Sequence, residues 1–196
     1  MPHKSLFPSP ARIILAMTGA SGTAYALTLL QALIQHPQVE PHLIVSPAAT
    51  TILELEAGQS LDDLPLKDIT VHDCGNPGAP PASGSWPHQG MVICPCSMAS
   101  LAAINHGTGH NLIHRAADVT IKEKRPLILV ARETPLSTVH LGNMLGLARA
   151  GATVLPACPG FYHRPATISD LINHLVGRIL DHLGLEHNLT PRWGET

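Results

Sequence analysis

Short apolar runs alternate along this chain with longer segments whose apolar residues recur at helical spacing. Residues 12–18 are the first such run and residues 23–35 the first helical segment. The stretch from Ile13 to Val39, which holds nearly all of both, contains no Asp, Glu, Lys or Arg. Strands of a parallel sheet are buried on both faces and read as continuous apolar runs, and helices connect one to the next. The alternation predicts an α/β fold with a mostly parallel sheet covered by helices on both faces.

The pattern continues to the end of the chain, whose 196 residues fit one domain better than two. We expect residues 1–11 to be a flexible N-terminal lead, residues 12–185 the domain and residues 186–196 a C-terminal tail. The predicted strands are 12–18, 42–45, 69–72, 91–94, 126–130 and 153–155, and the predicted helices are 23–35, 47–57, 97–104, 111–122, 138–150 and 167–183.

Composition excludes several classes of protein. The twelve Lys and Arg are scattered and the formal net charge is −2, which argues against a nucleic-acid surface. Four cysteines are too few for a disulfide scaffold, so we expect reduced thiols in a cytoplasmic protein. The charge-free stretch raises the alternative of a signal peptide, but glycines at 19 and 22 break it, and neither half approaches the ~20 apolar residues of a membrane span.

In sheets of this kind ligands bind outside the carboxyl ends of the strands, so the loops after the predicted strands are informative. The turn Gly19-Ala20-Ser21-Gly22 precedes a helix, where backbone N–H groups can approach a phosphate or an electron-rich ring. A tight strand-to-helix turn explains the same residues equally well. Ser97-Met98-Ala99-Ser100 opens another helix, and there simple N-capping is the alternative to ligand binding.

Charged side chains follow the later strands. Arg132 and Glu133 come directly after residues 126–130, where this fold presents chemistry, although a surface ion pair is the alternative. Lys122, Tyr162 and Arg178 are separately explained as surface or snorkelling side chains. Together, two cations and a phenol would clamp a phosphate without a metal.

Histidines are numerous, and His106, His110 and His114 are spaced as metal ligands on a helix would be. Gly107 and Gly109 between them oppose a regular helix there. We therefore expect no metal site.

Matched blocks along the chain carry a resemblance to a known family. They are Thr18-Gly19-Ala20-Ser21-Gly22, Ala82-Ser83-Gly84-Ser85-Trp86, Pro95-Cys96-Ser97-Met98, Asn111-Leu112, Arg115-Ala116-Ala117-Asp118-Val119, Lys122-Glu123, Arg132-Glu133-Thr134-Pro135-Leu136-Ser137, His140-Leu141, Asn143-Met144, Pro159-Gly160-Phe161-Tyr162 and Pro191-Arg192-Trp193-Gly194. In these blocks the chain resembles the flavin prenyltransferases of the UbiX type (the UbiX/Pad family of the flavoprotein superfamily), formerly described as aromatic-acid decarboxylases.

The resemblance implies a single-domain Rossmann-like or flavodoxin-like three-layer sandwich, in a homo-oligomer that is a dodecamer with its sites at subunit interfaces. It implies that reduced FMN accepts a dimethylallyl group from dimethylallyl phosphate at N5 and C6. The prenylated FMN would serve a separate decarboxylase of the UbiD type. No metal, nucleic acid or membrane takes part.

Carried over by residue, the resemblance implies three groups of site residues. Glu56 is expected to approach from a neighbouring subunit. The FMN contacts are Gly19, Ala20, Ser21, Ser46, Ser97, Met98, Ala99, Ser100 and Arg132; the donor site is Arg115, Lys122, Tyr162 and Arg178, with Trp86; and the catalytic residues are Ser21, Lys122, Glu133, Tyr162 and Arg178.

These residue types suit the chemistry. Breaking an allylic C–O bond develops positive charge on carbon and negative charge on phosphate, so cations at the phosphate and an aromatic wall beside the carbon both stabilise it. Trp86 is the candidate wall, with a packed loop aromatic as the alternative. Closing the new ring removes a proton from flavin C6, and either Glu133 or the released phosphate can accept it.

Two positions depart from the family pattern. Ala99-Ser100 stands where Lys-Thr is common, and Gly142 where Glu is common. The first leaves side-chain contacts at residue 99 in doubt, and the second does the same for a subunit contact. Two other functions are considered: a flavin-dependent cysteine decarboxylase, whose Pro-Ala-Ser-Ala-Asn-Thr block does not match residues 95–100, and a non-catalytic FMN-binding protein, which would not need Lys122, Glu133, Tyr162 or Arg178.

Overall fold

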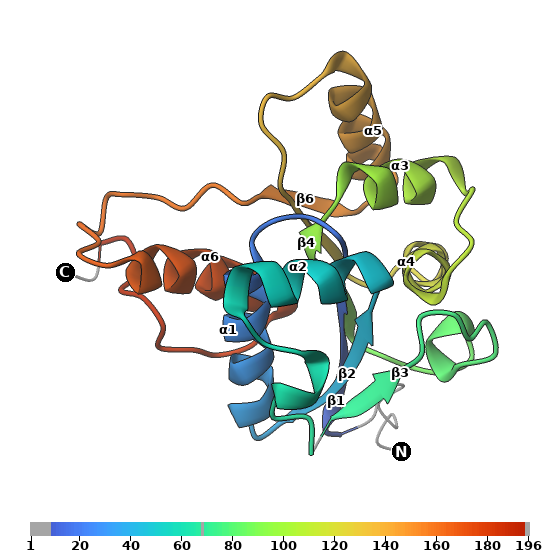
Figure 1. Ribbon diagram of the computed structural model, residues 1–196, viewed down its shortest axis with the longest axis horizontal. Coiled ribbons are helices and arrows are strands. Elements are labelled where there is room, and N and C mark those ends of the chain that lie inside the picture. The colour runs from blue at the N-terminus through green and yellow to red at the C-terminus, as the bar shows by residue number, and fades with distance from the viewer. Residues whose placement is uncertain (1–8, 68, 195–196) are drawn as a thin grey trace, which may run out of the picture.

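The computed structural model describes residues 9–67 and 69–194, and in that part of the chain six parallel strands form one sheet (Figure 1). The strand order is β3-β2-β1-β4-β5-β6. Its members are β1 (Ala11–Met17), β2 (Val39–Val45), β3 (Thr70–His72), β4 (Gly90–Cys96), β5 (Leu127–Ala131) and β6 (Thr153–Pro156).

Helices cover both faces of this sheet. Apolar side chains of α1, α2 and α6 pack on one face, and those of α3 and α4 pack on the other, so the expected three-layer α/β sandwich is confirmed. The helices are α1 (Thr23–Gln35), α2 (Pro47–Ala57), α3 (Met98–His106), α4 (Leu112–Lys122), α5 (Thr138–Arg149) and α6 (Ile168–Leu183), with 3₁₀ turns η1 (Leu61–Asp63) and η2 (Pro80–Ala82).

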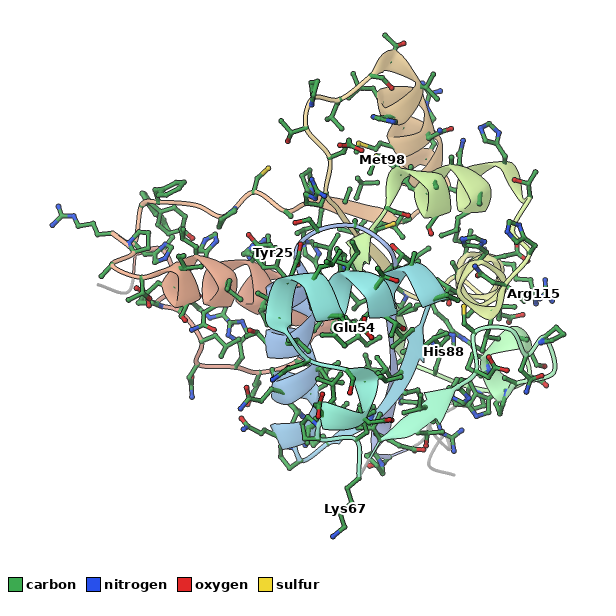
Figure 2. The ribbon with its side chains drawn as sticks, viewed as in Figure 1. Tyr25, Glu54, Lys67, His88, Met98 and Arg115 are labelled. Atoms are coloured by element: carbon green, nitrogen blue, oxygen red, sulfur yellow. The ribbon has the colours of Figure 1, made fainter. Side chains whose placement is uncertain are left out.

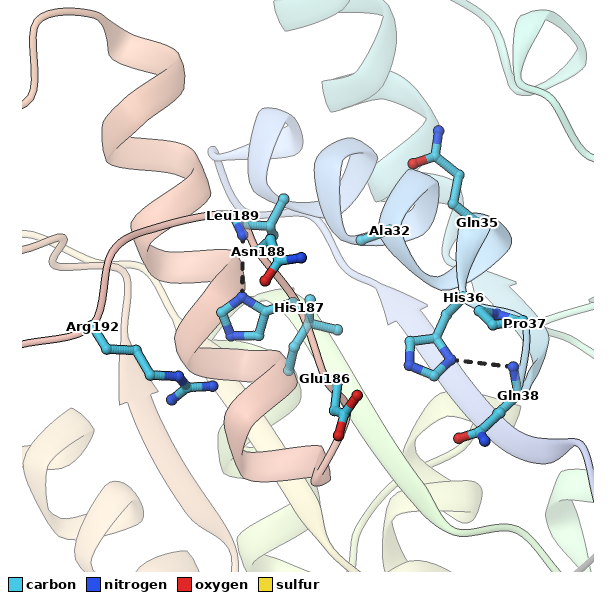
Figure 3. Close-up of a pocket in the computed structure, with 11 residues that line it drawn as sticks. Ala32, Gln35, His36, Pro37, Gln38, Glu186, His187, Asn188, Leu189 and Arg192 are labelled. Atoms are coloured by element: carbon cyan, nitrogen blue, oxygen red, sulfur yellow. Dashed lines mark hydrogen bonds between the residues drawn. The ribbon is translucent and has the colours of Figure 1, made fainter. Parts of the chain in front are cut away.

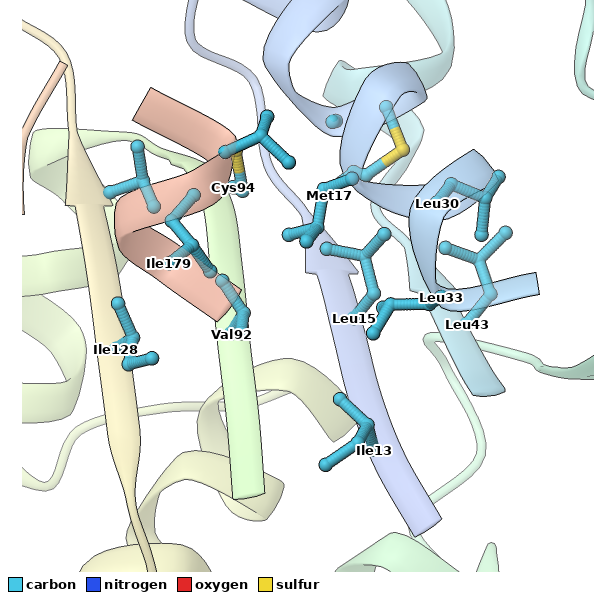
Figure 4. Packing of buried hydrophobic residues seen from close by; sticks show 14 of the residues in the cluster. Ile13, Leu15, Met17, Leu30, Leu33, Leu43, Val92, Cys94, Ile128 and Ile179 are labelled. Carbon is cyan, nitrogen blue, oxygen red and sulfur yellow. The ribbon is translucent and has the colours of Figure 1, made fainter. Parts of the chain in front are cut away.

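The central strands are apolar because both of their faces are covered. Along β1, Ile13, Leu15 and Met17 face α1 and α6, while Ile14 and Ala16 face α3 and α4. All five are almost completely buried, and Figure 4 shows the first set packed against the helices. This two-sided burial explains why the strand reads as an unbroken apolar run.

The strand order reverses between β1 and β4. The chain builds β2 and β3 outward on one side of β1, then returns to lay β4 on its other side and continues outward to β5 and β6. The loops leaving β1 and β4 therefore turn to opposite faces of the sheet and open a crevice between them. The residues that follow these two strands are the natural starting point for a site.

Two strands, β2 and β4, are longer than predicted by three residues each, and a proline explains each difference. Strand β2 begins at Val39 and includes Pro41, because pairing with β3 starts only at His42 and no β3 carbonyl needs the missing N–H. Strand β4 continues through Pro95 to Cys96, with its register against β5 shifted after Ile93. Such an irregularity accommodates a residue that cannot donate to the ladder.

The structure describes more of the C-terminal end of the chain than of the N-terminal end. Most of the predicted N-terminal lead, residues 1–8, lies outside the described residues. At the other end, residues 186–194 pack along α6, where Arg192 and His187 both contact Asp181. The division at residues 12 and 185 stays a prediction. All four cysteines are free, and no helix of residues 9–67 and 69–194 has the length and hydropathy to cross a bilayer.

Candidate active site

The side chain of Thr18 joins the loops that leave β1 and β4. Its hydroxyl donates to the carbonyl of Pro95 at 2.8 Å and accepts from the backbone N–H of Ser97, also at 2.8 Å. The backbone N–H of Thr18 donates to the same Pro95 carbonyl at 3.2 Å. Thr18 is 2% exposed, so these bonds are shielded from water and fix the floor of the crevice.

The glycine turn runs over this floor in a space too narrow for larger residues. A Cβ on Gly19 would lie 2.5 Å from the Cβ of Ala48, at the start of α2. Gly22 has φ 115°, a conformation that side-chain-bearing residues rarely adopt. The strand-to-helix turn is therefore real, and its close approach to α2 brings the starts of two helices together.

Glu56 occupies the N-terminus of α1. Its carboxylate accepts from the backbone N–H groups of Gly22 at 3.0 Å and Thr23 at 2.8 Å. Within one chain α2 brings Glu56 to the start of α1, and its expected approach to a neighbouring subunit stays a prediction. The donors assigned to a phosphate at this turn are shared with an internal carboxylate.

Ionisation of Glu56 is favoured at this position. Burial acts to raise its pKa, but hydrogen bonds from Ser21, Thr23 and Gly22 outweigh burial and hold the pKa below its usual value. A carboxylate at a helix N-terminus is also stabilised by the helix dipole. Ser21 thus lies between a fixed anion and the open crevice.

The other two helices that start at this edge are capped by serines named in the sequence analysis. Ser97 accepts from Ser100 N–H at 3.2 Å, as its N-capping interpretation predicts, and Ser46 caps α2 in the same way by accepting from Ala49 N–H at 3.1 Å. Their backbones are close to β1, since Ser46 N–H donates to the carbonyl of Met17 at 3.0 Å. Of the neighbours in α3, Met98 is buried in the core and Ala99 is exposed.

Arg132 closes this edge from the side of β5. Its Nε donates to the carbonyl of Ser21 at 3.2 Å, across the crevice from its own strand. Glu133 is exposed and its carboxylate accepts from Thr134 N–H at 3.0 Å. Within the described part of the chain no ion pair links Arg132 to Glu133, so the alternative of a surface pair is not observed.

Two of the expected donor-site cations lie on α4. Arg115 pairs with Asp118 at 2.6 Å and donates to the carbonyl of Ala82 in η2 at 3.2 Å. Lys122 is the last residue of the helix and pairs with Glu123. Figure 2 shows Arg115 on the α4 side of the molecule, away from Tyr25 beside the glycine turn.

The other two donor-site residues belong to the α6 side. Tyr162 lies in the loop between β6 and α6, half exposed, with the Trp193 ring edge-on at 4.9 Å. Arg178 lies on α6 and pairs with Asp181 at 2.9 Å. Helix α6 packs on the face of the sheet opposite to α4, so one chain does not bring Lys122 and Arg178 together.

Trp86 does not reach this edge within one chain, so its assignment as the aromatic wall stays a prediction. Its ring meets the ring of His42 edge-on at 4.8 Å, and the guanidinium of Arg12 lies 5.2 Å from the ring centre. Arg12 is the second residue of β1, at the end of the strand opposite to Ser21. The packed-aromatic alternative describes Trp86 within one chain, since edge-on contact with the buried His42 ring and a cation hold it there.

The histidine series does not gather into one cluster. His106 hydrogen-bonds to Asn143 at 2.9 Å, and the rings of His110 and His114 lie 5.7 Å apart. Residues 9–67 and 69–194 contain no group of three metal-ligating side chains placed to hold an ion.

A large cavity lies elsewhere. It has a volume of about 800 Å³ and is lined by residues at the end of α1 and by residues 186–189 (Figure 3). Since α1 begins at the glycine turn and ends at this cavity, the cavity is separated from the crevice by the length of the helix.

Comparison with known proteins places the chain among characterised relatives. The Flavoprotein family model matches residues 5–180. The flavin prenyltransferase UbiX of Pseudomonas aeruginosa is 46% identical, over 95% of this chain and 95% of the relative.

Two solved structures are also close. The structure of AnUbiX in complex with FMN and dimethylallyl pyrophosphate covers 94% of this chain and 97% of its own, with 43% identity and a TM-score of 0.91. A dodecameric FMN-dependent UbiX-like decarboxylase from Escherichia coli O157:H7 covers 93% of this chain and 98% of its own, with 46% identity and a TM-score of 0.90.

Replacing Thr18 with valine tests the link between the two loops. Thr18→Val keeps the shape but leaves the N–H of Ser97 without its acceptor, so we expect a loss of about 1–3 kcal/mol in the free energy of unfolding. Urea unfolding at fixed protein concentration measures it. The matched control is Thr51→Val on the exposed side of α2, which should cost less than about 0.5 kcal/mol. Equal effects of the two changes would contradict the role given to Thr18.

Replacing Glu56 with glutamine tests the carboxylate at the start of α1. Because the folded pKa of Glu56 lies below the ordinary 4.5, its charge stabilises the fold above that pH and ceases to do so as pH falls through the lowered value. Glu56→Gln should lower the free energy of unfolding by roughly 0.3–1 kcal/mol at pH 7 and by less near pH 3. Glu54→Gln on the same helix is the control. If the difference in the free energy of unfolding between the two variants does not change with pH, the contact of Glu56 with the start of α1 is contradicted.

Proposed function

The chain belongs to the Flavoprotein family and, within it, to the flavin prenyltransferases of the UbiX type, and on that basis we propose that it joins a dimethylallyl group to reduced FMN. The donor is dimethylallyl phosphate, the acceptor atoms are flavin N5 and C6, and the product is prenylated FMN. The observation that carries the proposal is the convergence of Ser21, Ser97 and Arg132 at the β1/β4 crevice.

The residues at this crevice fit a flavin nucleotide. The starts of α2 and α3 present backbone N–H groups at the sheet edge, and an anionic phosphate is stabilised by such helix ends. The turn from Gly19 to Ser21 offers a flat backbone surface, and the Arg132 guanidinium lies across it. In this arrangement Ala99 contributes through its backbone, because a methyl group supplies no polar contact.

The chain's own residues supply electrostatic catalysis. The allylic C–O bond breaks with its electron pair passing to the phosphate as the carbon bonds to N5, and the N5 proton passes to the released phosphate. The carbon bond to C6 then forms at the other end of the double bond, which takes up one proton while C6 releases one. Lys122, Arg178 and the Tyr162 hydroxyl neutralise the charge that develops on the leaving phosphate, with Arg115 nearby. No metal is needed where fixed cations serve this purpose.

Ring closure releases a proton from C6, and the structure adds a candidate acceptor. Glu56 contacts the N–H groups beside Ser21, and its lowered pKa keeps it ionised at neutral pH. A proton can pass through the Ser21 hydroxyl to this carboxylate. Glu133 and the released phosphate remain the other acceptors, and Glu56 is distinguished from them by its contact with the glycine turn.

Subunit assembly completes the site. Since Lys122 and Arg178 lie on opposite faces of one sheet, a shared phosphate must be held by cations from different chains. The exposed apolar side chains of α5, Val139 at 67% and Leu141 and Leu145 at 51%, offer a surface for a second copy. A Cβ on Gly142 would meet no atom within 4 Å, so that departure leaves room at the contact. A dodecamer like that of the E. coli relative is the assembly proposed.

The product leaves this enzyme for another. Prenylated FMN is made here for a decarboxylase of the UbiD type, and free thiols are consistent with a reducing cytoplasm. The cysteine decarboxylase alternative and the non-catalytic FMN-binding alternative are both weaker, because relatives 46% identical over nearly the whole chain are flavin prenyltransferases.

Mass spectrometry of the flavin tests the reaction. Purified protein incubated without oxygen with reduced FMN and dimethylallyl phosphate should yield a flavin heavier by one C5H8 unit. The same incubation with oxidised FMN is the control and should yield none. Unchanged flavin with both the monophosphate and the diphosphate donor would contradict the proposed function.

Mixing defective subunits tests the shared site. Lys122→Ala and Arg178→Ala should each abolish prenyl transfer, while co-expression of the two should restore about a quarter of wild-type activity through sites that combine intact faces. Tyr162→Phe with Arg178→Ala is the matched control, since both residues lie on the α6 side of one chain and their mixture should show no activity beyond that of its Tyr162→Phe chains. Restoration in neither mixture would refute a site divided between α4 and α6.

A further inference from the structure

The hydroxyl of Tyr162 is held by a histidine that the reaction described above does not use. His174 lies on α6, one turn before Arg178, and its Nε2 is 2.9 Å from the Tyr162 oxygen. On the other side of the same ring, Nδ1 accepts from the backbone N–H of Gly160 at 3.2 Å. The imidazole thus connects the helix to both ends of the Gly160–Tyr162 segment.

The Gly160 contact fixes which nitrogen of His174 carries the proton. A backbone N–H can only donate, so Nδ1 must present its lone pair, and the neutral ring then carries hydrogen on Nε2. Nε2–H can only donate, so the Tyr162 oxygen is the acceptor of their bond. The Tyr162 O–H hydrogen is left free to donate elsewhere.

Packing leaves little freedom for a different arrangement. A Cβ on Gly160 would lie 3.0 Å from the Tyr162 ring and 3.2 Å from the His174 ring, so the backbone is in close contact with both. The ring of Trp193, in the C-terminal segment after α6, lies edge-on to the Tyr162 ring with the ring centres 4.9 Å apart. The phenol is therefore clamped by the loop, the helix and the C-terminal segment.

A proton added to His174 would disturb this arrangement. The ring would then donate from both nitrogens and face the Gly160 N–H with another N–H. Burial, His163 and Arg178 all act to lower the pKa of His174 below its ordinary 6.5. His163 stacks on it at 4.9 Å with the planes 4° apart; the remaining titratable neighbours are Tyr162 and, at the start of α6, Asp170, which lies within electrostatic range of His163.

We propose that His174 is a positioning residue for donor binding: in its neutral Nε2–H form it orients Tyr162 so that the phenol O–H donates to the phosphate of dimethylallyl phosphate. The inference rests on the proposed function and extends it to a residue that touches no substrate. Accepting a hydrogen bond also polarises the Tyr162 O–H, which makes it a better donor to an anion. Lys122 and Arg178 supply charge, whereas the Tyr162–His174 pair supplies direction.

Steady-state kinetics of His174 variants test the assignment. His174→Phe keeps a flat ring but removes both contacts, and we expect the KM for dimethylallyl phosphate to rise about tenfold with kcat changed less than about threefold. His174→Gln can place an acceptor towards Gly160 and a donor towards Tyr162, and should recover most of the lost affinity. His182→Gln, the same change at an exposed position of α6, should match wild type.

The pH profile separates positioning from packing. As pH falls through the lowered pKa of His174, the KM of wild-type protein for dimethylallyl phosphate should rise more steeply than that of His174→Gln, because glutamine takes up no proton. Protonation of the donor phosphate, with a pKa of about 6, affects both proteins equally and cancels in their ratio. Parallel profiles of wild type and His174→Gln would overturn the proposal.

A double-mutant cycle with Tyr162→Phe tests whether His174 acts through the Tyr162 hydroxyl. If His174 acts through the hydroxyl, then adding His174→Phe to Tyr162→Phe should change the KM by less than about twofold. A full additional tenfold rise would show that His174 acts by another route.

NMR of the imidazole nitrogens gives a readout that needs no reaction. Nδ1 should be unprotonated and Nε2 protonated at pH 7.5. If Nε2 carries the hydrogen but the protein prenylates no flavin, only the proposed function is contradicted. If the protein prenylates FMN but Nδ1 carries the hydrogen, only the inference about His174 is contradicted.

Discussion

The hydroxyl of Thr18 connects the carboxyl ends of β1 and β4, the two strands between which the strand order of the sheet reverses. It accepts from Ser97 and donates to Pro95, so the loop after β1 and the loop after β4 form one buried hydrogen-bonded unit. The glycine turn, the start of α3 and the Arg132 guanidinium are all held against this unit. Without it, the crevice that topology creates would have no fixed floor on which a flat ligand could lie.

The sheet that creates this crevice also divides the site. Strands buried on both faces require helices on both faces, and the cations of α4 and α6 are thereby kept apart within one chain. A phosphate clamp built from Lys122 and Arg178 is available only where copies of the chain meet. In the proposed function the site therefore depends on assembly, and the exposed apolar residues of α5 are the surface proposed for it.

Much of the fold could be predicted from sequence because burial on both faces leaves a direct trace in β1 and β5. The serines at helix starts were predicted for a similar reason, since capping follows from local preference. The contact of Glu56 with the start of α1 could not be predicted, because only tertiary packing brings α2 over it. The packing of Trp86 could not be predicted, since its partners His42 and Arg12 come from distant segments. His174 gave no signal because its proposed role depends on one backbone N–H.

A crystal structure of the assembled protein with FMN bound tests the central claim most directly. The account predicts the flavin against the backbone of residues 19–21 and 97–100, with Arg132 of the same chain beside it and Lys122 of a neighbouring copy facing it. A flavin lodged instead in the cavity at the far end of α1, or one with Lys122 of every copy remote from it, would contradict the account.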